Sequence, residues 1–187
     1  AYASGGLQKE QAQRLLGYCS NVGPAFLFGI VAGAFEDPLI GWQLWGSQIL
    51  GALVTAWLLP GSPGAAAPKQ GKTQGDMLTL AVLTMGKICV TVILFRVVLC
   101  YGAKYLPVEG TAGVLLGGLL ELTNGCCSLK EVPAMLRKSV AGGLMALGGI
   151  CVLSQTKEVA EGLSLKYYFW GKGIQALVCI LGGFLKF

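Results

Sequence analysis

The chain has 187 residues, of which 54% are hydrophobic and 12% are charged, and its formal net charge is +5. An average soluble domain carries about 25% charged residues, so this composition predicts an integral membrane protein in contact with the lipid bilayer. The basic residues are spread over many short loops, which argues against a nucleic-acid-binding patch. We expect residues 1–187 to form a single, all-α, polytopic membrane domain.

The first helical part of this domain is predicted over residues 1–59. Residues 7–19 alternate apolar and polar side chains at helical spacing, which indicates a short interfacial helix. Residues 22–35 are apolar but shorter than the roughly 20 residues that an upright span needs, and Pro24 lies near their start. This pattern is typical of a half-helix or one arm of a re-entrant hairpin. Residues 39–59 are long enough to span, with Trp residues toward their ends.

The second helical part is predicted over residues 77–187, after a loop. Residues 60–76 are rich in Pro, Gly, Ala, Lys and Gln, which predicts a flexible connection. Residues 77–100 form the second predicted full span. The remaining predicted segments are a loop at 101–110, a short apolar helix at 111–120, an amphipathic stretch at 128–139, a short apolar helix at 140–153 that ends at Ser154, and a third full span at 167–187.

Two apolar stretches are interrupted by short polar breaks that contain glycine, at residues 20–24 and 121–125. In hydrocarbon, unwound backbone persists only inside protein or beside a polar cavity, because every N–H and C=O group must be satisfied. Discontinuous helices of this kind build substrate sites in secondary transporters. We therefore predict a solute site whose candidate residues are Ser20, Asn21, Gly23, Pro24, Glu121, Thr123, Asn124 and Gly125.

The residue types at the breaks suit a small polar or anionic solute. Ser20 and Asn21 offer hydroxyl and amide groups, and a helix beginning at Pro24 would aim its N-terminal N–H groups at an anion. At the second break, Glu121 and Asn124 can hydrogen-bond a polar solute or a coupling cation. The alternative is that these residues only cap helix ends while the glycines pack helices.

Lys87 lies near the middle of the predicted span over residues 77–100. A charge at the centre of a membrane helix costs about 2.5 to 3.5 kcal/mol on insertion scales, so it tends to face a partner or the bundle interior. One interpretation is that Lys87 is the charge partner of an anionic solute or of Glu121. The other is that the span is placed wrongly and Lys87 is interfacial.

The sequence gives no sign of catalytic or metal chemistry. The chain has seven cysteines and no histidine, and the cysteines show no metal-ligand spacing. No nucleophile and base stand in a recognisable constellation. We therefore expect neither an enzyme nor a metal or organic cofactor.

Residues 14–29, RLLGYCSNVGPAFLFG, and residues 118–125, GLLELTNG, resemble the sporulation integral membrane protein YlbJ family. That family belongs to the nucleoside-recognition, or gate, domain group, whose members resemble portions of concentrative nucleoside transporters. The resemblance implies a spore-forming bacterium and movement of dipicolinic acid, a small aromatic dicarboxylate, across a membrane surrounding the forespore. The alternatives are a nucleoside transporter of the gate-domain type and a structural membrane protein of spore assembly that moves no solute.

The resemblance also implies roles for the break residues and for the missing part of the chain. A dianion would use the start of the half-helix at Pro24, the amides of Asn21 and Asn124, and Lys87, while Glu121 would hold a cation or order Lys87. Members of the family are longer, and this chain resembles their C-terminal half. We expect a missing N-terminal half, a homo-oligomer or a partner subunit to complete the carrier.

Overall fold

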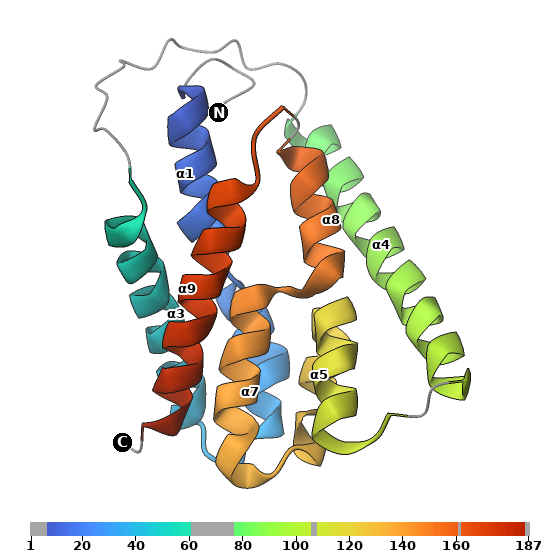
Figure 1. Ribbon diagram of the computed structural model, residues 1–187. Helices are drawn as coiled ribbons and strands as arrows, with labels where there is room; N and C mark the ends of the chain where they lie inside the picture. The colour runs from blue at the N-terminus through green and yellow to red at the C-terminus, as the bar shows by residue number, and fades with distance from the viewer. Residues whose placement is uncertain (1–6, 61–76, 106–107, 161, 186–187) are drawn as a thin grey trace.

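The computed structural model describes residues 7–60, 77–105, 108–160 and 162–185, and within them the chain is helical without any strand (Figure 1). Three helical stretches are long and apolar enough to cross a membrane: Lys9–Ala34, Ala81–Gly102 and Ala134–Glu158. The all-α, polytopic membrane fold that the composition predicts is therefore confirmed. The predicted loop over 60–76 lies outside the described residues, apart from Pro60.

The N-terminal part begins with α1 (Lys9–Cys19), close to its predicted range. After the first break, Pro24 occupies the first turn of a continuous helical segment, where its fixed φ suits a helix start. The segment consists of α2 (Pro24–Phe26), the π-helical turn η1 (Leu27–Val31) and the 3-10 turn η2 (Ala32–Ala34). It ends at Phe35, whose backbone is extended, and α3 (Leu39–Leu58) follows.

The second part begins with α4 (Met77–Tyr105), which is longer than the predicted span. The predicted loop over 101–110 is wrong because α4 continues to Tyr105, and the next helix already starts at Gly110. The remaining elements are α5 (Gly110–Leu120), α6 (Leu122–Cys127), the 3-10 turn η3 (Leu129–Glu131), α7 (Ala134–Leu147), α8 (Gly149–Val159) and α9 (Lys166–Phe184).

Two further predicted segments are divided differently in the structure. The amphipathic stretch over 128–139 is not one helix, because Pro133 separates η3 from α7. The short helix predicted over 140–153 is also divided, since Gly148 and Gly149 have φ values of 77° and 76°. These left-handed conformations end α7 and start α8, which then runs through Ser154, the predicted end of the segment.

The stretches that are long and apolar enough to cross a membrane are not the three full spans that the sequence predicted. Of the predicted full spans, only 77–100 coincides with one of the three long apolar stretches, and the other two stretches are interrupted helices. The predicted spans at 39–59 and 167–187 do form helices, α3 with 20 residues and α9 with 19. Their hydropathy is lowered by polar residues such as Gln48 and Lys172, which are buried inside the bundle.

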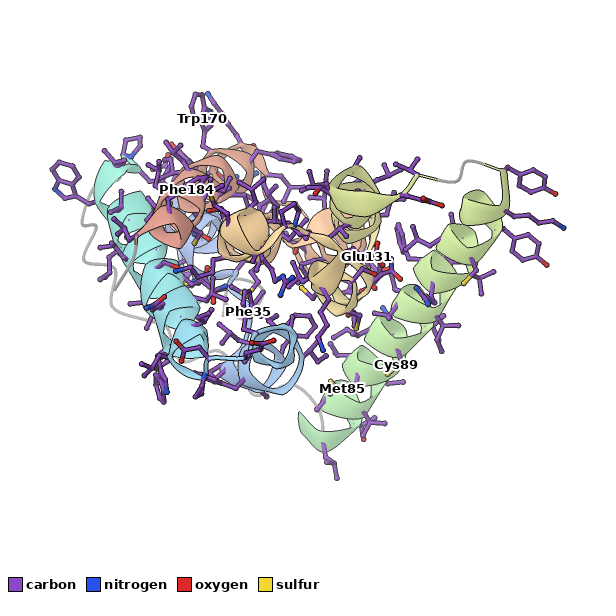
Figure 2. All side chains as sticks on the ribbon, turned by 90° about the horizontal axis from the view of Figure 1, so that it is seen from below. Phe35, Met85, Cys89, Glu131, Trp170 and Phe184 are labelled. Carbon is purple, nitrogen blue, oxygen red and sulfur yellow. The ribbon has the colours of Figure 1, made fainter. Side chains whose placement is uncertain are left out.

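Helix α9 lies at the centre of the described bundle, with α7, α3 and α1 packed along it (Figure 1). A continuous apolar core joins the first half-helix to α3, α5, α6 and α7 through residues such as Leu27, Leu44, Val114 and Leu144. By contrast, α4 leans away from the bundle and meets it mainly at α8 (Figure 2). None of the apolar residues in the Ala81–Gly102 stretch is buried within the chain.

Candidate functional site

Three helix interruptions lie inside the bundle rather than at its ends: Ser20–Gly23, Glu121 and Gly148–Gly149. Figure 1 shows that α5 and α7 end, and α8 begins, at a similar height partway along α9. The third interruption packs against the last turn of α5, just before the second, since a Cβ at Gly149 would lie 2.9 Å from the Gly118 carbonyl oxygen. The sequence predicted the first two interruptions, whereas the third falls inside the short helix that was predicted over 140–153.

The first interruption is covered by polar side chains from α9. The Gln175 amide nitrogen donates a hydrogen bond of 3.1 Å to the carbonyl oxygen of Gly17, in the last turn of α1. The Lys172 ammonium donates to the carbonyl oxygen of Ser20, directly after that helix. Both side chains are buried, at 0% and 5% exposed. Two of the carbonyl groups around the end of α1, those of Gly17 and Ser20, are thus bound by a helix more than 150 residues later, while Asn21 binds those of Tyr18 and Cys19.

Lys172 is a buried cation without a carboxylate partner among the described residues. The only ion pair in that part of the chain joins Lys87 to Glu158. The Lys172 ammonium lies 5.6 Å from the centroid of the Tyr168 ring, which gives it a weak cation–π contact. Ionisable residues inside membrane segments are costly and commonly mark a substrate or ion pathway. Lys172 therefore identifies the first interruption as the stronger candidate site.

A pocket of about 210 Å³ lies beside this interruption, between the end of α1 and one face of α3. At its inner side, Gln48 is 2% exposed, and both its amide nitrogen and its amide oxygen lack a hydrogen-bond partner in the described structure. Leaving a buried amide unpaired is costly, so this group is suited to a ligand that supplies the missing bonds. The pocket is lined by Tyr18, Asn21, Val22, Trp45, Gln48, Ile49, Ala52, Leu53 and Ala56.

Arg14 adds a second cation near the pocket. Its Nη2 donates a hydrogen bond of 2.8 Å to the carbonyl oxygen of Ala56, which lines the pocket. Its Nε is buried and has no partner among the described groups. Arg14, Gln48 and Lys172 were not among the predicted site residues. Gln48 and Lys172 are polar residues within largely apolar helices, whereas Arg14 lies on the amphipathic helix α1.

The predicted residues of the first break have mixed positions. Asn21 lines the pocket, but it is largely exposed, and its side-chain nitrogen donates 2.8 Å to the carbonyl oxygen of Tyr18. Ser20 is half-buried and contributes its main-chain oxygen to Lys172. Gly23 and Pro24 are exposed and begin the half-helix, as predicted. Contact of these residues with a solute stays a prediction.

The second predicted break is much shorter than expected. Only Glu121 leaves the helical conformation, because Leu122–Cys127 forms α6, which includes the predicted residues Thr123, Asn124 and Gly125. The buried carboxylate of Glu121 accepts hydrogen bonds from the main-chain N–H groups of Thr123 at 2.9 Å and Asn124 at 2.7 Å. Both carboxylate oxygens are thus used to cap α6.

Asn124 and Gly125, which were predicted as site residues of the second break, pack against α5. A Cβ at Gly117 would lie 2.7 Å from the side-chain nitrogen of Asn124, and Gly125 faces the backbone of Gly118. These contacts hold α5 and α6 together at short distance. The capping and packing alternative accounts for the observed geometry of the second break, and solute contact there stays a prediction.

Lys87 lies on α4, which packs mainly against α8. The first break, by contrast, is surrounded by groups from α3 and α9. The Nζ of Lys87 is 3.8 Å from the Glu158 Oε2, and both side chains are mostly exposed within the chain. The ion pair seen in the structure is therefore with Glu158, where the sequence suggested Glu121. The pair borders a hollow of about 580 Å³ between α4 and α8.

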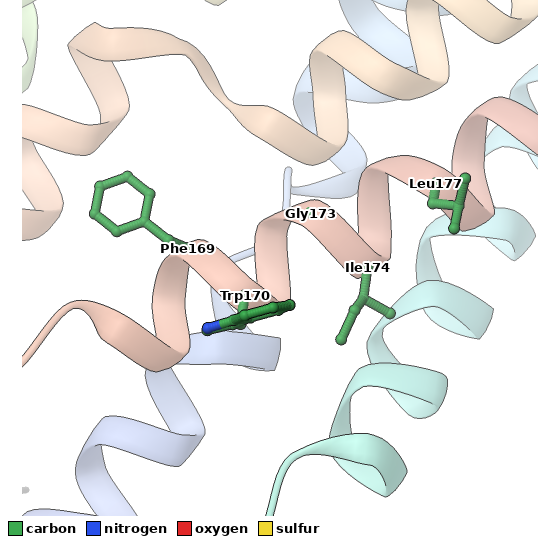
Figure 3. A pocket seen from close by; sticks show the side chains of 5 residues that line it. All are labelled: Phe169, Trp170, Gly173, Ile174 and Leu177. Atoms are coloured by element: carbon green, nitrogen blue, oxygen red, sulfur yellow. The ribbon is translucent and has the colours of Figure 1, made fainter.

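The outer face of α9 carries a shallow apolar hollow formed by one helix alone. The hollow is lined by Phe169, Trp170, Gly173, Ile174 and Leu177, all of which belong to α9 (Figure 3). Trp170 is 64% exposed, whereas the neighbouring Tyr168 is 2% exposed and turned inward. We interpret the outer face as a lipid-facing surface, because it presents almost no polar group to a solute.

Comparisons of the chain with protein-family models, curated proteins and solved structures find no match.

Proposed function

We propose that this chain forms the solute-binding part of a membrane transporter for a small organic anion, with dipicolinic acid as the candidate solute during sporulation. The observation that carries the proposal is Lys172, a buried cation beside an interrupted helix without a carboxylate partner among the described residues. Burying a charge is costly unless something compensates it. The Ser20 carbonyl oxygen offsets part of this charge, and a carboxylate of the solute would offset the remainder.

The pocket near the first interruption supports an anion with an aromatic ring. The unpaired amide nitrogen of Gln48, which lines the pocket, is a donor that can meet a carboxylate oxygen. Arg14 does not line the pocket, but it places a positive charge beside it, since its Nη2 binds the carbonyl oxygen of Ala56. Tyr18 and Trp45 line the same pocket and offer flat apolar surfaces. Dipicolinate combines a planar ring with two carboxylates and would use both kinds of group.

The proposed location is a bacterial cell membrane, and in a spore-former the membrane that surrounds the forespore. The carrier would be completed by further helices from a missing N-terminal half, a second copy or a partner subunit. The exposed apolar surface of α4 supports such an assembly, although lipid would also satisfy it. The described residues offer no group of His, Cys, Asp and Glu side chains that could hold a metal.

Ligand-dependent thermal stability of the purified protein in detergent tests the proposal. Dipicolinate at about 100 times its dissociation constant should add roughly 2.7 kcal/mol to the free energy of unfolding, because it binds only the folded state. A nucleoside and a mismatched dicarboxylate such as succinate serve as comparison ligands. Stabilisation by the nucleoside alone would favour a nucleoside carrier, and no stabilisation by any ligand would favour the structural role.

A pair of variants places the binding site. Gln48→Leu removes both amide atoms from the pocket. It should raise the dipicolinate concentration needed for half-maximal stabilisation at least tenfold, which corresponds to about 1.4 kcal/mol of binding free energy. Gln43→Leu is the matched control, since Gln43 lies on the same helix and does not line the pocket. Equal dipicolinate responses in the two variants would place the solute elsewhere.

A further inference from the structure

Lys172 holds its ammonium group where a transporter with broken helices commonly holds a coupling cation. In such transporters, main-chain carbonyl groups at unwound helix ends coordinate the ion. Here the ammonium donates to the Ser20 carbonyl oxygen, directly after α1, and the partial negative charge of that helix end favours a cation. The neighbouring Gly17 carbonyl oxygen is bound by the Gln175 amide of the same helix α9.

The surroundings of Lys172 contain more oxygen acceptors than the described donors satisfy. Gln175 is fully buried, and its amide oxygen has no hydrogen-bond partner in the described structure. The side chain of Tyr168 is also buried beside Lys172, and its hydroxyl oxygen can accept a hydrogen bond as well as donate one. Tyr168, Lys172 and Gln175 stand four and three residues apart, a spacing that places them on one face of α9. Buried oxygen atoms in excess of donors are the environment that a positive charge requires.

We infer that Lys172 is a built-in cation that occupies the position of a coupling ion, so that the site is complete without Na⁺. The ammonium supplies the charge that a bound metal ion would otherwise bring to the interrupted helix. This inference goes beyond the proposed function and does not depend on the identity of the solute. Its consequence is that Na⁺ binding is absent from the natural protein and is created when the lysine side chain is removed.

The test measures the thermal stability of the full chain in detergent without solute, in NaCl, LiCl or choline chloride at equal ionic strength. The wild-type protein should unfold at the same temperature in all three salts. Lys172→Ala leaves the oxygen atoms without a cation and opens space for a small ion. This variant should be least stable in choline chloride, and NaCl or LiCl should raise its unfolding temperature saturably by roughly 2 to 4 °C or more.

Lys87→Ala is the matched control, because Lys87 is mostly exposed on α4 and lies apart from the carbonyl groups at the end of α1. It should show no difference among the three salts. Lys172→Arg keeps the positive charge and should also lack a Na⁺ response. A response of Lys172→Arg that equals that of Lys172→Ala would contradict the inference.

Two further results would overturn the inference. One is a saturable rise in the unfolding temperature of the wild-type protein in NaCl, which needs no variant and therefore remains decisive if Lys172→Ala does not fold. The other is a folded Lys172→Ala protein with the same unfolding temperature in all three salts. The dipicolinate response of the wild-type protein, measured separately in choline chloride, tests the proposed function independently of this result.

Discussion

Gly171 of α9 lies directly against the main chain of Gly17 in α1, so that a Cβ at position 171 would collide with the Gly17 carbonyl group. The same carbonyl oxygen accepts the hydrogen bond from the Gln175 amide. Close approach of the two helices is therefore a condition for the polar contacts that close the first interruption. Small residues at helix crossings allow this approach in membrane proteins.

This contact gives a paired prediction on stability. Gly171→Ala should destabilise the protein by about 1 to 3 kcal/mol, because the added methyl group must push α9 away from α1. Gly173→Ala is the control, since no atom lies within 4 Å of its added Cβ, and it should be neutral or stabilising. Thermal unfolding of both variants in detergent checks the prediction. Equal unfolding temperatures would show that the two helices are not in close contact.

The fold class and the approximate helices follow from the sequence, because composition and the length of apolar runs report on the solvent around each segment. The first break was also visible locally, since Ser20, Asn21 and Gly23 stop one helix and Pro24 begins another. The resulting half-helix begins at Pro24, the residue that the sequence predicts as its start. Local signals of this kind do not depend on the rest of the chain.

The polar cover of the first break could not be predicted in the same way. Lys172 meets the Ser20 carbonyl group across 152 positions of sequence, and a single sequence contains no direct record of that contact. The sequence over 167–187 has the pattern of an ordinary membrane span with aromatic residues near its start, so Lys172 and Gln175 were not predicted as site residues. A charged residue inside an apolar run is nevertheless the signal that would have identified this site.

For Glu121 and the Gly148–Gly149 pair, the residue types suggest a role that differs from the role seen in the structure. A carboxylate beside Thr, Asn and Gly suggests ligand binding, yet Glu121 binds two N–H groups of its own chain. Adjacent glycines in an apolar segment suggest helix packing, yet this pair turns the chain between α7 and α8. In both cases the same residue types serve two purposes, and only the three-dimensional arrangement separates them.

The capping role of Glu121 predicts a graded loss of stability. Glu121→Ala should cost about 0.5 to 2 kcal/mol, because two main-chain donors at the start of α6 lose their acceptor. Glu121→Gln should cost less, since its remaining carbonyl oxygen can accept one of the two hydrogen bonds. Glu131→Ala, an exposed substitution in η3, is the control. Thermal unfolding measures this loss. An unfolding temperature of the Glu121→Ala protein equal to that of the wild type would rule out the cap as a stabilising element.

The ion pair between α4 and α8 predicts a small coupling energy in a double-mutant cycle. Lys87→Met and Glu158→Gln should show a coupling of about 0.2 to 1 kcal/mol in detergent, because both side chains are mostly exposed to screening. High salt should reduce this value. The cycle of Lys87→Met with Glu121→Gln should be additive, since the carboxylate of Glu121 binds the start of α6 instead. Coupling with Glu121 but not with Glu158 would reverse this assignment.

The third interruption predicts a difference between two glycines with the same backbone conformation. Gly149 and Gly162 have φ values of 76° and 78°, so an alanine at either position costs about 1 to 2 kcal/mol of backbone strain. Only at Gly149 would the added Cβ also crowd α5, at 2.9 Å from the Gly118 carbonyl oxygen, whereas nothing lies within 4 Å at Gly162. Gly149→Ala should therefore lower the unfolding temperature more than Gly162→Ala. Equal losses in the two variants would mean that the turn between α7 and α8 does not pack against the end of α5.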